Sequence, residues 1–165
     1  MNHQNFDTMK SFRNNTYTQI HIHVVFAVKN RESLILDSWK NRLYDYISGI
    51  IQNRTHKLLA IGGVSDHIHL LIGMRPTQSL SYLIGDVKGC SSKWINEQRL
   101  SNGWFAWQEG YGAFSYAKEE LPDVINYIIR QHEHHKQESM VNEYIKILDE
   151  NGVEYDERNI FKEVK

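Results

Sequence analysis

The stretch that decides the fold is Val64-Ser65-Asp66-His67-Ile68-His69-Leu70-Leu71-Ile72-Gly73. Successive side chains of a strand point to opposite faces, so His67 and His69 share one face. Ile68, Leu70 and Ile72 share the other face. Two imidazoles at this spacing can hold a metal ion, although a strand histidine is more often half-buried and bonded to a backbone group. The rest of the chain has to separate these two interpretations.

The flanking sequence predicts partner strands for this stretch. Residues 57–63 form a short apolar run before a turn at Gly62-Gly63 and Ser65-Asp66, which is typical of a β-hairpin. Upstream, residues 17–29 alternate over a longer strand, which carries a second histidine pair, His21 and His23, on one face. Any metal site must therefore use one of the two pairs or both.

Helical periodicity fills the intervals between these strands. Apolar residues recur every three or four positions, after capping residues or a proline, in four segments. The predicted helices are 37–54, 79–98, 121–137 and 140–150, and a fourth strand is expected inside the aromatic segment 104–117. Tyr127 and Gln131 lie four residues apart, on one side of the third helix.

The order strand, helix, strand, strand, helix, strand predicts an α+β, ferredoxin-like (RRM-like) antiparallel sheet with both helices on one face. The first and third strands are then the adjacent central pair. Their apolar faces should lie under the helices, so that His21, His23, His67 and His69 share the other face. The third helix is the element left to cover that face, where Tyr127 and Gln131 would approach His67 and His69.

Composition describes an ordinary soluble protein. The chain has 165 residues, 41% of them hydrophobic and 24% charged, with no apolar run long enough to cross a membrane. We expect a disordered arm at 1–16, one folded domain at 17–150 and a charged tail at 151–165. The single cysteine, Cys90, excludes an intramolecular disulfide, and the polar start of the chain favours a cytoplasmic location.

Three separated motifs occur in one order: His67-Ile68-His69, the segment 107–114 (WQEGYGAF) and the segment 127–135 (YIIRQHEHH). Together they resemble the single-tyrosine HUH transposases of the insertion sequence 200/605 type (IS200-like) and their REP-associated relatives. The resemblance covers roughly residues 17–150, which would form the catalytic domain. It implies a homodimer, with the catalytic tyrosine supplied in cis or in trans.

The resemblance also implies a site. His67, His69 and Gln131 would bind Mg²⁺ or Mn²⁺, and Tyr127 would be the nucleophile that cleaves and rejoins single-stranded DNA with hairpin ends through a 5′-phosphotyrosine intermediate. The chemistry is reasonable, because a phenol with a pKa near 10 is a weak nucleophile and a cation can polarise the phosphate that it attacks.

DNA contacts would need a local basic surface, because the net charge is only −1. Candidate DNA-binding residues are Lys29, Arg31, Lys88, Lys93, Tyr111 and Arg130. Two alternatives stay open. One is a non-catalytic ferredoxin-like module that binds single-stranded or hairpin nucleic acid by aromatic stacking, and the other is a zinc site that uses all four strand histidines.

Overall fold

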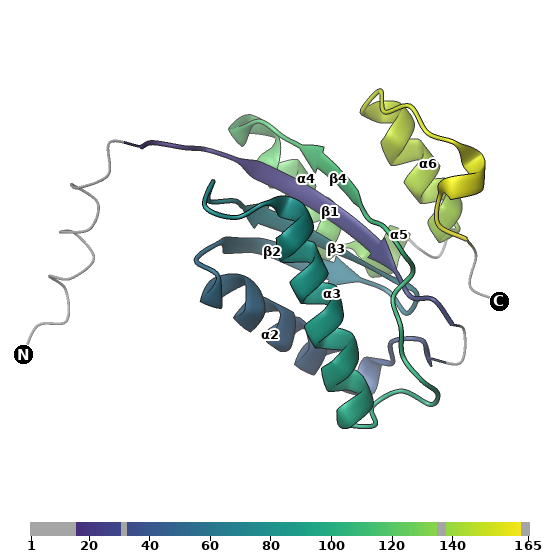
Figure 1. Cartoon of the computed structure of the whole chain (residues 1–165). Helices are drawn as coiled ribbons and strands as arrows, with labels where there is room; N and C mark the ends of the chain where they lie inside the picture. The colour runs from purple at the N-terminus through teal and green to yellow at the C-terminus, as the bar shows by residue number, and fades with distance from the viewer. Residues whose placement is uncertain (1–15, 31–32, 135–137, 163–165) are drawn as a thin grey trace, which may run out of the picture.

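The computed structural model describes residues 16–30, 33–134 and 138–162 (Figure 1). Its strands are β1 (His21–Ala27), β2 (Lys57–Gly63), β3 (His67–Gly73) and β4 (Gly112–Ser115). Its helices are α2 (Asp37–Asn53), α3 (Leu80–Glu97), α4 (Leu121–Ile129), α5 (Gln131–His134) and α6 (Met140–Glu150), with short 3-10 turns η2 (Lys118–Glu120) and η3 (Glu157–Asn159). The predicted disordered arm, apart from Thr16, falls outside these residues.

The strands form one antiparallel sheet in the order β2-β3-β1-β4. β1 and β3 are the central pair, so the predicted ferredoxin-like fold is confirmed. In their register His69 lies opposite Val25 and His67 lies opposite Ala27. Side chains directly opposite each other project from the same face, so the histidine face of β3 continues across β1.

Helices α2 and α3 cover one face of the sheet and enclose the main core (Figure 1). Ser79 caps α3 by accepting a hydrogen bond from the Tyr82 backbone N–H at 3.2 Å. Below the helices, Ile68, Leu70 and Ile72 of β3 are fully buried. Within the described residues, no helix is both long and apolar enough to span a bilayer.

The histidine face is partly covered by α4 and α6 (Figure 1). Two glycines let these helices approach the backbone closely. A Cβ on Gly62, the β2 residue opposite His69, would lie 2.1 Å from the Ile128 carbonyl oxygen of α4. A Cβ on Gly112 of β4 would lie 2.6 Å from the Tyr144 ring of α6. The glycines thus set how close each helix lies to the histidines.

We expect Gly62→Ala to destabilise the protein by about 1–3 kcal/mol, because its methyl group displaces α4 from the sheet. The shift in urea midpoint at constant slope measures this loss. The matched control is Gly49→Ala in α2, where an added Cβ has nothing within 4 Å and alanine favours the helix by about 1 kcal/mol. Equal stability of Gly62→Ala and the wild-type protein would contradict the close-approach explanation.

The structure corrects three boundaries. β1 begins at His21 rather than residue 17. β2 has the predicted bounds 57–63, so Gly62-Gly63 end that strand and the turn follows them. The predicted third helix is interrupted at Arg130, whose φ of −91° and ψ of 17° separate α4 from α5. This interruption directs Gln131 inward, where it is only 1% exposed. Residues 135–137 of that helix prediction lie outside the described residues.

The C-terminal segment contacts the domain after α6. Phe161 is buried and its ring lies 4.7 Å from that of Tyr144, and the Lys162 backbone exchanges two hydrogen bonds with the Gln108 side chain. The division at residue 150 stays a prediction.

Candidate active site

The Nε2 atoms of His67 and His69 point toward one place above the sheet. The Nδ1 atom of each ring faces away from that place and contacts another side chain. His67 Nδ1 lies 2.7 Å from Asp66 Oδ1. His69 Nδ1 lies 2.8 Å from Nε2 of His23, whose ring stacks on it at 5.1 Å. Partners of this kind fix the ring orientation of metal-binding histidines.

The second histidine pair does not act as a pair. His23 contacts His69 at Nδ1, the ring nitrogen of His69 that faces away from the cluster. His21 is the first residue of β1, lies opposite Gly73 and is half-buried. The group of possible ligands that the described residues form is His67, His69 and Glu143. The four-histidine zinc alternative therefore receives no support from this geometry.

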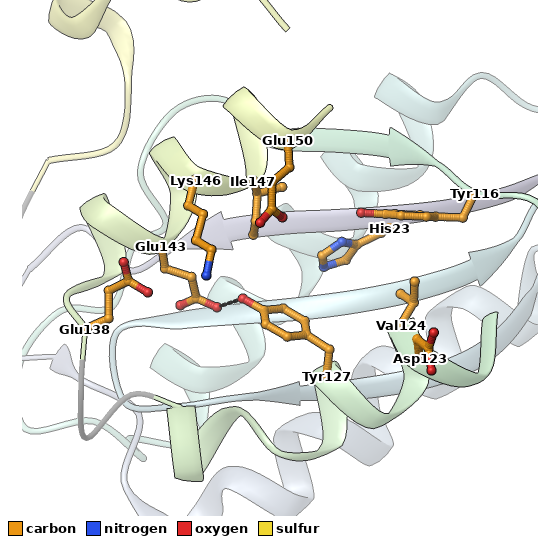
Figure 2. Close-up of a pocket in the computed structure, with 10 residues that line it drawn as sticks. All are labelled: His23, Tyr116, Asp123, Val124, Tyr127, Glu138, Glu143, Lys146, Ile147 and Glu150. Atoms are coloured by element: carbon orange, nitrogen blue, oxygen red, sulfur yellow. Dashed lines mark hydrogen bonds between the residues drawn. The ribbon is translucent and has the colours of Figure 1, made fainter. Parts of the chain in front are cut away.

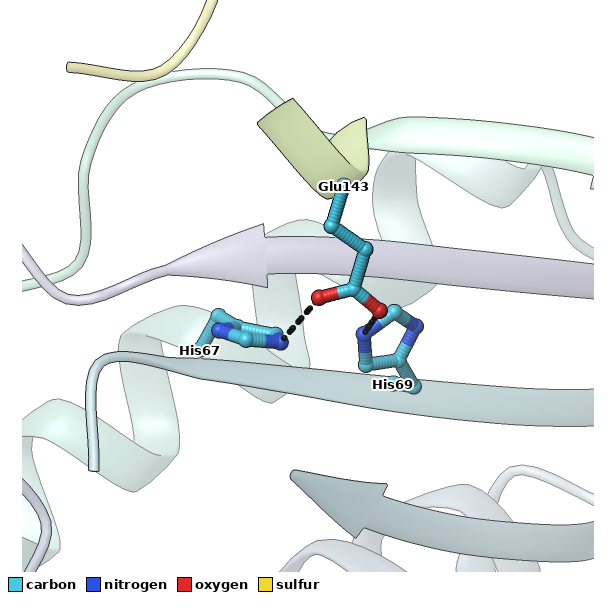
Figure 3. A group of neighbouring side chains, drawn as sticks. All are labelled: His67, His69 and Glu143. Carbon is cyan, nitrogen blue, oxygen red and sulfur yellow. Dashed lines mark ion pairs between the residues drawn. The ribbon is translucent and has the colours of Figure 1, made fainter. Parts of the chain in front are cut away.

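Glu143 of α6 completes the group (Figure 3). Its Oε2 lies 3.3 Å from His67 Nε2 and its Oε1 lies 3.4 Å from His69 Nε2, and the three ligand atoms fall within 4.8 Å of one another. The sequence interpretation missed this residue. Its signal was a carboxylate on the apolar side of α6, in line with buried Met140, Tyr144 and Ile147, a position that an unpaired charge rarely occupies.

Gln131 reaches the same point from α5. Its Oε1 lies 3.2 Å from His67 Nε2, and its Nε2 donates to Glu143 Oε1 at 3.0 Å. The structure thus brings the three predicted ligands, His67, His69 and Gln131, together, and adds a carboxylate between them.

Tyr127 enters the site from α4 of the same chain (Figure 2). Its hydroxyl donates a short hydrogen bond to Glu143 Oε1, and its ring stands edge-on to that of His69 at 5.7 Å. Burial, and then the Glu143 carboxylate, raise the pKa of Tyr127 above its ordinary value of 10. The phenol is therefore held protonated beside the histidines.

The charges of the cluster are strongly coupled. Burial lowers the pKa of His67, but its contacts with Asp66 and Glu143 outweigh this effect and raise the pKa to about 9. Burial lowers the pKa of His69 to about 4, and Glu143 offsets only part of that effect. Burial would raise the pKa of Glu143, yet the two histidines hold it well below its usual range. Near neutral pH the cluster thus contains an imidazolium and a carboxylate.

This donor set fits a divalent metal ion. Two imidazole nitrogens with carboxylate and amide oxygens suit ions such as Mn²⁺. His69 Nε2 is fully buried, and its neighbour Glu143 Oε1, at 3.4 Å, does not meet it with hydrogen-bond geometry. A buried nitrogen without a well-aligned hydrogen bond lowers the stability of the protein unless a ligand binds it. The same reasoning applies to the buried carboxylate, whose charge a cation would offset.

Metal binding should release a proton from His67. A metal needs the Nε2 lone pair, and the raised pKa of about 9 means that the metal-free ring is mostly protonated at pH 7. Since the proton competes with the metal, affinity should rise about tenfold per pH unit from pH 6 to 8 and level off above pH 9. Calorimetric Mn²⁺ titrations in buffers of different ionisation enthalpy count the protons released. A count near zero with a flat affinity would contradict the expectation.

The DNA-binding role of the predicted basic and aromatic residues stays a prediction, and the structure shows the surroundings of most of them. Lys88 Nζ donates to the Gln108 and Gly110 carbonyls, both at 2.7 Å, and so supports the aromatic segment. Lys93 is exposed beside Glu97 at 3.8 Å, and Arg130 is exposed beside Glu133 at 4.0 Å. Lys29 is exposed, Tyr111 packs half-buried on the core, and Arg31 lies outside the described residues.

The comparisons with known proteins agree with this fold. Residues 16–131 match the family described as "Transposase IS200 like". A structure described as a candidate transposase from Deinococcus radiodurans shares 20% identity at a TM-score of 0.57, covering 72% of this chain and 95% of its own. A REP-associated tyrosine transposase bound to a REP hairpin shares 13% identity at a TM-score of 0.57, covering 92% and 95%. No curated protein sequence matches.

Because the family match spans well over half of the chain, the protein belongs to the IS200-like transposase family. It is accordingly a DNA-processing enzyme of the transposase class. The buried cluster of His67, His69 and Glu143 is compatible with a divalent metal site.

Proposed function

We propose that this protein is a metal-dependent transposase that cleaves and rejoins single-stranded DNA through a 5′-phosphotyrosine intermediate. One observation carries the proposal: the Tyr127 hydroxyl and the two histidine Nε2 atoms meet at a single carboxylate, Glu143. A nucleophile and a ligand cluster at one point form the arrangement that phosphoryl transfer needs. The residues come from three separate elements, α4, β3 and α6.

In the proposed reaction, Tyr127 Oη attacks a DNA phosphorus, and the bond from phosphorus to the 3′ oxygen breaks. The 5′ phosphate remains bonded to the tyrosine, and the other fragment leaves as a free 3′-hydroxyl. The phenol donates its hydrogen bond to Glu143, so this carboxylate orients the attacking oxygen, and the phenol proton passes through water to the leaving 3′ oxygen, which becomes the hydroxyl. A 3′-hydroxyl of a second strand reverses the step and releases Tyr127, and the strands are rejoined without an external energy source.

The metal would be held by His67 and His69, with oxygens from Glu143 and Gln131 beside them. When bound, a divalent ion supplies positive charge that stabilises the phosphate oxygens during transfer. The residues themselves do not favour a phenolate, since burial and Glu143 raise the pKa of Tyr127. Because the protein alone keeps the phenol protonated, we propose that the reaction depends on added metal.

Single-stranded DNA with hairpin ends is the proposed substrate. The neighbouring REP-associated transposase is bound to a REP hairpin, and the family match supports a DNA substrate. We further propose a homodimer in the cytoplasm. In the described chain Tyr127 approaches its own His69, which supports a tyrosine acting in cis.

The decisive experiment is to incubate the protein with Mn²⁺ or Mg²⁺ and a labelled single-stranded oligonucleotide pool, and then to separate the products under denaturing conditions. We expect a protein–DNA adduct that disappears with EDTA and returns on adding excess metal. Salt-sensitive binding that is indifferent to metal and gives no adduct would instead favour the non-catalytic binding module.

A further inference from the structure

A pocket of about 610 Å³ opens beside Tyr127, between α4 and α6 (Figure 2). This volume is in the range of small-ligand sites in proteins. The roles proposed above use three of the residues that line the pocket: Tyr127 and Glu143 at its inner end, and His23 behind His69.

Aromatic rings form the floor of the pocket. His23 lies 6.1 Å from the Tyr116 ring and 6.3 Å from the Tyr127 ring, between centroids. Planar rings in a pocket of this size offer stacking surfaces for a planar ligand, and nucleobases stack on tyrosine and histidine in this way.

His23 also presents an unused polar atom. Its side chain is only 1% exposed, and while Nε2 bonds His69, Nδ1 makes no hydrogen bond to any described residue. His23 lines the pocket, so the edge of a ligand that reaches this floor gains a hydrogen-bonding partner.

The charges around the pocket argue against a phosphate as its occupant. Four carboxylates line it, from Asp123, Glu138, Glu143 and Glu150, against the single ammonium of Lys146. The ammonium points toward Glu143 and Tyr127 at the inner end (Figure 2). A phosphate deeper in the pocket would meet like charge, whereas the amino group of a base is a donor that carboxylates accept.

We propose that this pocket binds one unpaired DNA base next to the cleaved phosphate, and that it favours bases with an exocyclic amino group over thymine. The proposal rests on the function proposed above, since Tyr127 would attack the adjoining phosphate. The base stacks on Tyr116, its edge reaches His23, and the carboxylates that line the pocket accept from its amino group. The base must be unpaired, because a base inside a duplex cannot enter a pocket.

The test uses a random single-stranded DNA pool with a fixed 5′ tag, incubated with the full-length protein and Mn²⁺. Sequencing the DNA joined to the protein gives the base after the cleaved bond, and sequencing the released tagged fragments gives the base before it. We expect thymine to be disfavoured about tenfold at one of these two positions.

The informative variant combines Asp123→Ala with Glu150→Ala, which removes both acceptors, and should reduce that bias to less than about threefold while adducts still form. The matched control combines Asp45→Ala with Glu97→Ala, two exposed acids on α2 and α3, and should keep the full bias. Wild-type adducts without base preference at either position would overturn the proposal, as would an unchanged bias in the pocket variant.

A second measurement separates this proposal from the proposed function. Deoxycytidine or deoxyguanosine, added at millimolar concentration to labelled protein, should shift the ring NMR signals of His23 and Tyr116, and thymidine should shift them at least fivefold less. If wild-type protein forms no adduct but these shifts occur, the pocket stands and the cleavage proposal fails. If no nucleoside shifts these signals, the pocket proposal is overturned even where adducts form.

Discussion

Tyr127→Phe should abolish the covalent DNA adduct, with a loss of roughly 10³-fold or more, because it removes the attacking oxygen and leaves the ring in place. The ring packs edge-on to His69 and lies in a partly buried position, so phenylalanine should preserve the fold. Loss of adduct on a denaturing gel, at matched protein and Mn²⁺ concentrations, measures the effect.

Two further measurements show whether the loss of adduct comes from the missing Tyr127 hydroxyl. Tyr127→Phe should still bind Mn²⁺, because the phenol is not one of the clustered ligands. The control Tyr82→Phe changes a tyrosine that is 74% exposed on α3, across the sheet from the site, and should form adduct normally. An adduct that persists in Tyr127→Phe would identify another nucleophile and refute the assignment.

His67→Ala should lower Mn²⁺ affinity at least about a hundredfold and abolish adduct formation. It removes one of two imidazole ligands, and metal sites lose even 10–100-fold when a supporting partner is lost. Calorimetric titration measures the affinity, and circular dichroism confirms folding. Should the alanine variant unfold, His69→Gln, which keeps the side-chain volume closer to the original, makes the same test.

His21→Ala is the matched control for this experiment. His21 lies on the same strand face but outside the cluster, so its loss should leave Mn²⁺ affinity within about twofold. A loss of Mn²⁺ affinity as large as that of His67→Ala would support a site built from all four strand histidines.

Glu143→Gln supplies a further comparison, because it keeps the side-chain oxygen but removes the charge. It should weaken Mn²⁺ binding more than Gln131→Ala does.

Much of the fold was predictable from local pattern. Alternation defined β3 and its neighbours, and helical spacing with a serine cap defined α3, because each of these signals is contained in its own segment. The interruption at Arg130 was not predictable, since the sequence on both sides suits a helix and only packing against Gly62 shows where α4 must end.

The site divides in the same way. The spacing of His67 and His69 could be read directly, and the resemblance supplied Tyr127 and Gln131. Glu143 could not be placed, because it is distant in sequence from the histidines and reaches them only through the way α6 lies over β4. The contacts of Lys88 were equally hidden, because its ammonium binds two carbonyls of a segment whose path no local pattern reveals, and its DNA-binding role stays a prediction.

Glu143 also lies beyond the family-matched region, which ends at Gln131. The proposed nucleophile and both imidazoles lie inside the matched region, whereas the carboxylate comes from the following helix, α6. Under the proposed function, a substitution at Glu143 would change the charge of the ligand set and leave the attacking phenol in place. The metal preference of this protein would then be adjustable separately from its nucleophile.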